Sequence, residues 1–359
     1  MRRLAAALAL TATVCLVPAG RPAGQSASSF AQQIAALSEA GGYFDTDNLI
    51  SNESSYLQVL PELRRRGVNG GVYIGVGPDQ NFTYIAEVRP ALAFIVDIRR
   101  DNLLLHLLFK ALFQMSSSRV EYLSLLFGRP VPADDGRWRS APIERLAEYV
   151  DRTPAAGVDQ LRARVDRTIA GFGVPLSAED RRTIDRFHRG FISAGLELRF
   201  QSAGQPPRSY YPTYRDLLLD KDSTGRQANL LAAEDAFQFV RSLQSHDLVI
   251  PVVGDIAGSG ALAAVGRLVA EKHERLSAFY TSNVEFYLFR SGTFPRFVSN
   301  LSAIPRSDRT VIIRSIFNRY AFEGMRPNDN SASQLHRVDD LLAASAAGRI
   351  RGYADLVGR

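Results

Sequence analysis

The chain has 359 residues, of which 46% are apolar and 22% are charged, and its formal net charge is +6. These proportions are typical of a globular protein with one large domain or two ordinary ones. Only three of the 43 basic residues are lysines, and the arginines are interleaved with 37 acidic residues without a run of five like charges. This pattern argues against a nucleic-acid-binding surface, so we expect no nucleic-acid partner.

The first residues predict an export signal. Two arginines precede an apolar stretch that ends at Val17, and the small residues up to Ala19 suit cleavage by signal peptidase. The stretch is shorter than the roughly 20 residues that a membrane span needs. We therefore expect a signal peptide over residues 1–19, no membrane span after its cleavage, and a periplasmic or secreted protein; an uncleaved anchor is the alternative. Cleavage would also remove Cys15, the only cysteine, so we expect no cysteine-based zinc site.

The N-terminal third contains two apolar runs that predict buried strands. Residues 20–29 are rich in Gly, Pro and Ser and predict a flexible leader, and the following "FAQQIAALSEA" has helical spacing. The runs "VYIGV" and "LAFIVDI" lack polar alternation, which is typical of strands buried on both faces. The stretch "NLLLHLLFKALFQM" then predicts a buried helix, in which we expect His106 to be a core residue.

The rest of the chain alternates between helices and strands. Residues 116 to about 234 predict a helical insertion, and strands follow in "LVIPVVGDIAG", "SAFYTSNVEFYLF" and "RTVIIRSIF", with a helix between successive strands. This alternation predicts an α/β fold with a doubly wound, mainly parallel sheet and helices on both faces. We expect this domain over residues 30–320 and a helical tail over residues 321–359.

The turn after the first predicted strand has features of a nucleotide-binding loop. Gly75 and Gly77 let the backbone turn sharply and approach a ligand, and the helix after Asp79 would direct its free amides at that ligand. Asp97 ends the next strand 20 residues after Gly77, where a carboxylate can accept hydrogen bonds from both ribose hydroxyls of a nucleoside. Gln80 takes the place of the third glycine of dinucleotide loops, which disfavours a pyrophosphate. A tight turn without a ligand is the alternative.

With these residues the chain resembles the class I S-adenosylmethionine-dependent methyltransferases, in which the first strand ends in G-x-G and an acid ends the second. Gly254-Asp255 resembles the family's turn near the adenine, and "TSNVEFY" lies where the fourth strand carries a substrate-side motif. The resemblance covers residues 50–105 and 235–320. It implies a Rossmann-like fold with S-adenosylmethionine as cofactor, Gly75, Gly77 and Asp79 near its methionine part, Asp97 at the ribose and Asp255 at the adenine. For Asp255 the alternative is that it only caps the next helix. More closely, the chain resembles exported bacterial proteins of unassigned function that share "YIGVGPDQNFTYIA" and "YTSNVEFYL".

Four further residues are candidates for the same pocket. Asn283 and Glu285 lie two apart, so on a strand they would face one side, where they would hydrogen-bond either a substrate or only each other's loop. Glu53 would line the pocket from the N-terminal segment or satisfy free amides at a helix start, and Tyr280 would stack on a ligand or belong to the core. The family's proline pair is missing beside Asn283, and its final antiparallel hairpin is not evident after Phe317.

Other chemistries have weaker support. The five histidines form no zinc-binding motif, and the G-x-S-x-G elbow of serine hydrolases does not occur. Two hypotheses remain: a methyltransferase that uses S-adenosylmethionine on an unknown substrate, or a non-catalytic exported binding or scaffold protein that keeps the same fold. We expect a nucleoside-type ligand and no metal, and the sequence names no protein partner.

Overall fold

The computed structural model describes residues 27–46, 48–133, 135–202, 205–206, 208–317, 326 and 329–357. The expected signal peptide over residues 1–19, with Cys15, and residues 20–26 of the expected leader lie outside these ranges. The end of that leader is helical, because α1 (Ala27–Leu37) begins at Ala27 and buries Phe30 and Ile34 in the core.

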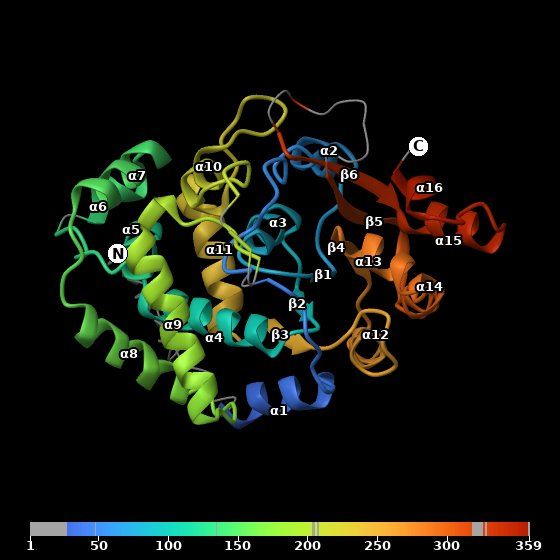
Figure 1. The fold of residues 1–359 in the computed structure, drawn as a ribbon, viewed down its shortest axis with the longest axis horizontal. Coiled ribbons are helices and arrows are strands. Elements are labelled where there is room, and N and C mark those ends of the chain that lie inside the picture. The colour runs from blue at the N-terminus through green and yellow to red at the C-terminus, as the bar shows by residue number, and fades with distance from the viewer. Residues whose placement is uncertain are drawn as a thin grey trace, which may run out of the picture.

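The strands form one six-stranded sheet in the order β3-β2-β1-β4-β5-β6 (Figure 1). Their bounds are Val72–Gly75 (β1), Leu92–Asp97 (β2), Val249–Val253 (β3), Leu276–Ser282 (β4), Arg306–Phe317 (β5) and Ser331–Arg337 (β6). The first five strands are parallel, whereas β6 is antiparallel to β5, with Ile313 opposite Leu335. The α/β class and the mainly parallel sheet are therefore confirmed.

Strand β6 lies in the segment that was expected to be a helical tail. It precedes the two helices of that segment, α15 (Val338–Ala346) and α16 (Tyr353–Val357). Its sequence "SASQLHR" is short and largely polar, so it lacks the apolar pattern that marks a strand. An antiparallel strand thus pairs with β5, although none is evident in the sequence after Phe317.

Helices cover both faces of the sheet (Figure 1). One set packs together beside β1, β2 and β3 and consists of α3 (Gln80–Val88), α4 (Arg100–Met115) and α11 (Glu234–Ser245). The other set consists of α1, α12 (Ala261–Glu271), α14 (Phe294–Ser302) and α15, which contact one another and reach β3, β2 and β5. The chain extends the sheet from β1 in one direction and then in the other, so right-handed connections place the two sets on opposite faces.

Further helices are inserted between α4 and α11, as expected for residues 116 to about 234. They are α5 (Arg119–Leu126), α6 (Asp135–Arg139), α7 (Ile143–Arg152), α8 (Val158–Ala170), α9 (Ala178–Ala194) and α10 (Tyr214–Leu219), and most are green in Figure 1. Arg119 holds this insertion together, because its buried guanidinium donates to the carbonyl oxygens of Leu231 (2.7 Å) and Ala141. Two shorter helices, α2 (Leu60–Arg65) and α13 (Val284–Arg290), precede β1 and follow β4.

Residues 38–46 and 48–56, which we name the N-terminal strap, cross the sheet edge at which the parallel strands end. Their contacts follow the spatial order of the strands: the Glu39 amide with Val253 of β3, the Gly42 amide with Ile98 after β2, Glu53 with Ser282 of β4 and Ser315 of β5, and Ser55 with Ser331 of β6. The strap therefore covers the edge of a parallel sheet where ligands usually bind.

Candidate functional site

A cleft of about 700 Å³ lies between the N-terminal strap and the carboxyl ends of β1, β2, β3 and β4. The strand order reverses between β1 and β4, and such a reversal is the usual place for a ligand in an open α/β sheet. Five predicted site residues line this cleft: Glu53, Gly77, Asp97, Asp255 and Asn283. The other four, Gly75, Asp79, Tyr280 and Glu285, lie outside its lining.

The turn after β1 places only its second glycine in the cleft. A Cβ on Gly75 would lie 1.9 Å from Oδ1 of Asn81, so Gly75 makes room for a protein side chain and not for a ligand. The Asn81 amide nitrogen in turn donates to the carbonyl oxygens of Val76 (2.9 Å) and Pro78 (2.8 Å) and fixes the turn from the inside. Gly77 has a φ of 81°, a conformation that favours glycine, and it lines the cleft.

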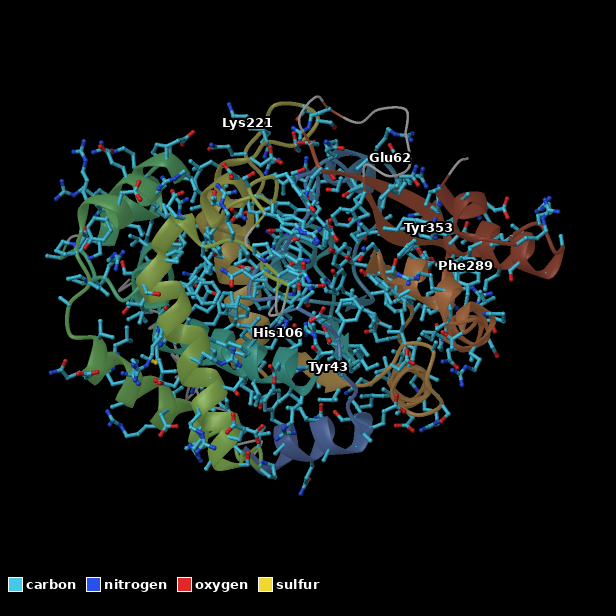
Figure 2. All side chains as sticks on the ribbon, in the orientation of Figure 1. Tyr43, Glu62, His106, Lys221, Phe289 and Tyr353 are labelled. Carbon is cyan, nitrogen blue, oxygen red and sulfur yellow. The ribbon has the colours of Figure 1, made fainter. Side chains whose placement is uncertain are left out.

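His106 also holds the turn after β1, from the interior of the protein. It lies in the interior on α4 (Figure 2), and its Nε2–H donates to the Gly77 carbonyl oxygen at 2.9 Å. Burial lowers the pKa of His106 to about 4, so the ring is neutral at neutral pH. The expectation that His106 is a core residue is confirmed.

Asp97 lies in the predicted place, but its carboxylate already has a partner. Arg99 donates to it through its backbone amide (2.9 Å) and through Nη2 (3.1 Å), and both side chains are nearly buried. Arg99 also donates to the Thr46 carbonyl oxygen of the strap at 3.0 Å. The pair therefore joins the end of β2 to the strap, and a ligand hydroxyl would have to share the Asp97 oxygens with Arg99.

The glycine-rich loop after β3 is filled by a side chain of the strap. Oε1 of Glu39 accepts from the Asp255 amide at 2.9 Å, and Oε2 accepts from the Ala261 amide at the start of α12. A Cβ on Gly258 or Gly260 would lie only 2.5 Å or 2.3 Å from these carboxylate oxygens. The loop is thus shaped around Glu39, while Asp255 accepts from the Ala257 amide (2.8 Å) and faces the cleft.

Asp79 turns away from the cleft and toward the insertion. It lines a separate small pocket together with Tyr214 of α10, which hydrogen-bonds its carboxyl group. That group is enclosed, although the residue as a whole keeps some exposed surface. Burial raises the pKa of Asp79 from 3.8 to about 7. Asp79 does not line the cleft, in which it was expected to lie near the methionine part of a ligand.

Asp79→Asn is expected to remove a pH dependence of stability. The folded protein holds the Asp79 proton more tightly than the unfolded chain, so stability falls as pH rises from about 4 to about 7 and the full loss is present above pH 7. A shift of this size corresponds to about 4 kcal/mol, and partial exposure reduces the expected gain of the variant to about 2 kcal/mol at pH 8. Urea denaturation at pH 4 and pH 8 measures the free energy of unfolding of the variant and of the wild type. An equal difference between the two proteins at both pH values would contradict the expectation.

At the end of β4 the chain leaves the strand earlier than expected. Ser282 is its last residue and has a φ of 52°, and α13 begins at Val284. The alternation that would put Asn283 and Glu285 on one side is therefore lost. Asn283 lines the cleft, whereas the fully buried Glu285 pairs with Arg314 of β5. The expectation that both face a substrate is wrong for Glu285.

Tyr280 and Glu53 lie beneath the same strand end. Tyr280 is fully buried, and its hydroxyl accepts from Nε2 of Gln80 at 2.9 Å, so it belongs to the core. Glu53 is 1% exposed, and its carboxylate oxygens accept from the hydroxyls of Ser282 on one side and Ser315 on the other, while the Tyr280 hydroxyl also hydrogen-bonds the group. Burial raises the pKa of Glu53 above its usual value. Among the described residues no basic side chain pairs with it.

A family model described as a domain of unknown function, DUF7790, matches residues 48–129 and 202–344, which is more than half of the chain. The chain belongs to the DUF7790 family. A comparison with curated proteins finds no match. The DUF7790 segments contain the five predicted residues that line the cleft, whereas Glu39 precedes them. The stretch between the two segments, 130–201, falls within the helical insertion and contains α6 to α9.

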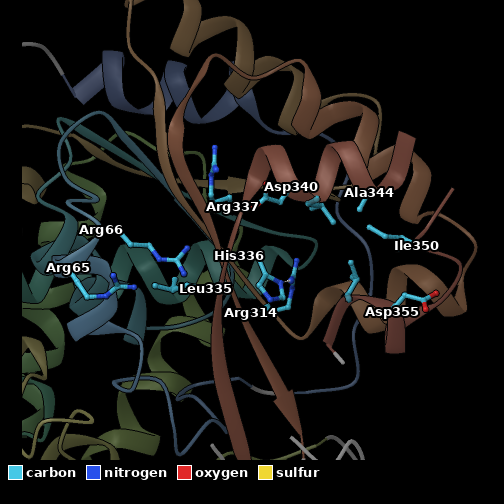
Figure 3. Close-up of a pocket in the computed structure, with 12 residues that line it drawn as sticks. Arg65, Arg66, Arg314, Leu335, His336, Arg337, Asp340, Ala344, Ile350 and Asp355 are labelled. Carbon is cyan, nitrogen blue, oxygen red and sulfur yellow. Dashed lines mark hydrogen bonds between the residues drawn. The ribbon is translucent and has the colours of Figure 1, made fainter. Parts of the chain in front are cut away.

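The DUF7790 chain has a second cavity, of about 570 Å³, beside the edge strand β6 (Figure 3). Arg314 and His336 lie together on β5 and β6, and Arg66 reaches the cavity from the end of α2. The two arginines have partners, because Arg66 donates to Glu62 at 2.6 Å and Arg314 pairs with Glu285. The cleft at the strand ends is the stronger candidate, because five predicted site residues meet there at the reversal of strand order.

The described part of the DUF7790 chain can also be compared with the expectations on metal ions and membrane spans. No group of three His, Cys, Asp or Glu side chains within it is arranged to hold a metal ion. Nor does it contain a helix that is long and apolar enough to cross a membrane.

Proposed function

We propose that the cleft binds S-adenosylmethionine or a related nucleoside and that the DUF7790 chain is a methyltransferase-like protein with a Rossmann-like sheet of that type. One observation carries the proposal: Gly77, Asp97 and Asp255, which follow or end three different strands, line one cleft at the reversal of strand order. Its volume of about 700 Å³ lies within the range of small-molecule sites. The antiparallel strand next to β5 also supports the proposal, as does the order of the parallel strands.

Each lining residue has a role in this proposal. The Gly77 backbone approaches the ligand without a Cβ, Asp97 accepts from the ribose hydroxyls with the oxygen positions that Arg99 leaves free, and Asp255 lies at the adenine edge. Asn283 faces the methyl acceptor. S-adenosylmethionine supplies the methyl group when bound, and the contribution of the chain is to hold the acceptor in line with it, which is largely an effect of positioning.

Two observations favour the second candidate, a non-catalytic binding or scaffold protein. Arg99 occupies part of the Asp97 carboxylate, and Glu39 fills the glycine loop after β3. Both are side chains of the protein itself in places where a nucleotide would otherwise have free access. The export signal expected over residues 1–19 supports the same candidate, since S-adenosylmethionine is a cytoplasmic compound.

Isothermal titration of the purified chain with S-adenosylmethionine and with its demethylated product separates the two candidates. The first predicts a Kd in the micromolar range, about −8 kcal/mol. Asp97→Asn is then expected to weaken binding about tenfold or more, because a charge-assisted hydrogen bond to the ribose becomes a neutral one. Asp79→Asn is the matched control, since Asp79 lies outside the cleft. A folded protein that takes up neither compound would rule out the first candidate and leave the second.

A further inference from the structure

Ser282 occupies a position that parallel α/β sheets use for nucleophiles. It ends β4, it has a left-handed φ of 52°, and α13 begins two residues later. A residue other than glycine adopts this conformation only at a cost, and such strain is found disproportionately at functional sites. A sharp turn from strand to helix presents a serine hydroxyl above the sheet in serine hydrolases. Here the turn has Tyr280 and Val284 where those enzymes have glycines, and Ser282 lines the cleft.

The hydroxyl of Ser282 has a suitable proton acceptor. It donates to Oε1 of Glu53, and the Ser315 hydroxyl donates to Oε2 of the same carboxylate and fixes its orientation. Glu53 is almost fully buried and forms no ion pair among the described residues, where its carboxyl group is hydrogen-bonded by the hydroxyls of Ser282, Ser315 and Tyr280. This is the arrangement of nucleophile, base and orienting group that activates a serine. Among the described residues that line the cleft there is no histidine, so the carboxylate stands alone as the base.

We propose that Ser282 is a nucleophile with Glu53 as its general base, and that the cleft transfers acyl groups from carboxylic esters. The Ser282 oxygen forms a bond to the acyl carbon while its proton passes to the Glu53 carboxylate. The bond between the acyl carbon and the alcohol oxygen then breaks, and the leaving alkoxide takes that proton. Water next attacks the acyl carbon and gives a proton to Glu53, which returns it to the Ser282 oxygen as the carboxylic acid departs.

The rim of the cleft indicates the class of ester. Phe44 of the strap and Tyr287 of α13 contact each other edge to face at 4.9 Å, and Phe200 and Tyr211 line the cleft from the insertion side. These rings offer an apolar surface in the cleft that Ser282 also lines. An apolar or aromatic acyl group therefore fits the cleft better than a charged one. The activity does not depend on binding of a nucleoside, although both ligands would compete for the same space.

A fluorophosphonate probe tests the proposal directly. Attack by the Ser282 oxygen on phosphorus releases fluoride and leaves a stable adduct, which intact mass and peptide mapping of the full chain locate. We expect one adduct, on Ser282, and none in Ser282→Ala. Glu53→Gln keeps the shape of the side chain without the base, and labelling is expected to slow about 100-fold or more. Ser291→Ala is the matched control, because Ser291 lines the same cleft but its hydroxyl bonds to backbone carbonyls and to Thr293.

Circular dichroism and the melting temperature show whether each variant is folded. If Glu53→Gln does not fold, Glu53→Asp takes its place; it retains the charge but withdraws it from Ser282, and labelling is expected to slow at least about tenfold. Release of nitrophenol from nitrophenyl butyrate by the wild type, lost in Ser282→Ala, would support turnover. A folded wild type that takes up no probe, an adduct on another serine, or a folded Glu53 variant that labels as fast as the wild type would overturn the proposal.

Discussion

Glu285→Ala is expected to lower the free energy of unfolding by about 3–5 kcal/mol. Glu285 and Arg314 are both fully buried, and their two contacts measure 2.6 Å and 3.0 Å. The guanidinium of Arg314 also contacts His336, whose pKa burial lowers to about 4, so this neighbour is neutral at neutral pH and does not replace the charge of Glu285. Removal of Glu285 therefore leaves a buried cation without a counter-charge, which is the costly case for a buried pair.

Urea denaturation measures the effect, and two further variants identify its cause. Replacing both partners by apolar residues, Glu285→Leu with Arg314→Met, is expected to cost much less than the sum of the single changes, because neither charge is then left alone. Glu285→Gln keeps a hydrogen-bond acceptor and should lie between wild type and Glu285→Ala. A loss below about 1 kcal/mol for Glu285→Ala would mean that water reaches Arg314, in contradiction to its burial.

Gly75→Ala is expected to cost about 3 kcal/mol or more, whereas Gly77→Ala costs about 1–2 kcal/mol. A Cβ at Gly75 would meet Oδ1 of Asn81 at 1.9 Å and the Tyr73 ring at 2.8 Å, so the turn after β1 must open. At Gly77 the nearest atom would be 3.5 Å away, in Asn48, and the left-handed backbone is the main cost.

The same denaturation experiment ranks the two variants. Adding Asn81→Ala to Gly75→Ala is expected to recover part of the loss, because it removes the clashing oxygen. The reverse ranking, with Gly77→Ala the more damaging, would mean that Gly75 is not enclosed as described. Since Gly77 lines the cleft and Gly75 does not, only Gly77→Ala should also change ligand or probe uptake at equal stability.

The sequence predicts those parts of the fold that form continuous apolar runs or helices with regular apolar spacing. The strands β1 to β5 are apolar runs between turns, and each was expected at nearly its observed place. Strand β6 was missed because it pairs only with β5 and its residues are mostly polar. The error at Glu285 has a related origin, since alternation was assumed to continue past Ser282 where the chain turns into α13.

In the candidate site, sequence spacing located backbone turns better than it located side-chain partners. Gly77, Asp97 and Asp255 lie in the cleft because each follows or ends a strand of the sheet. Glu39 contacts the amide of Asp255 across 216 positions, and no local pattern marks such a contact. Arg99 lies only two residues after Asp97, so the pairing of these two was within reach of the sequence. Ser282 lies at the turn between β4 and α13. This turn was not predicted because the two glycines of the G-x-S-x-G pattern are absent from it.

The N-terminal strap has a consequence for the time course of folding. Ser55 bonds to Ser331, 276 positions later, so the strap contacts a surface that exists only after β6 has been synthesised and has formed. Contacts at such long range close late, because the entropy of the intervening chain opposes them. The N-terminal strap, which covers the cleft, is therefore expected to reach its final position last. A small molecule present at that moment would be enclosed, and its later escape would be limited by how often the strap lifts.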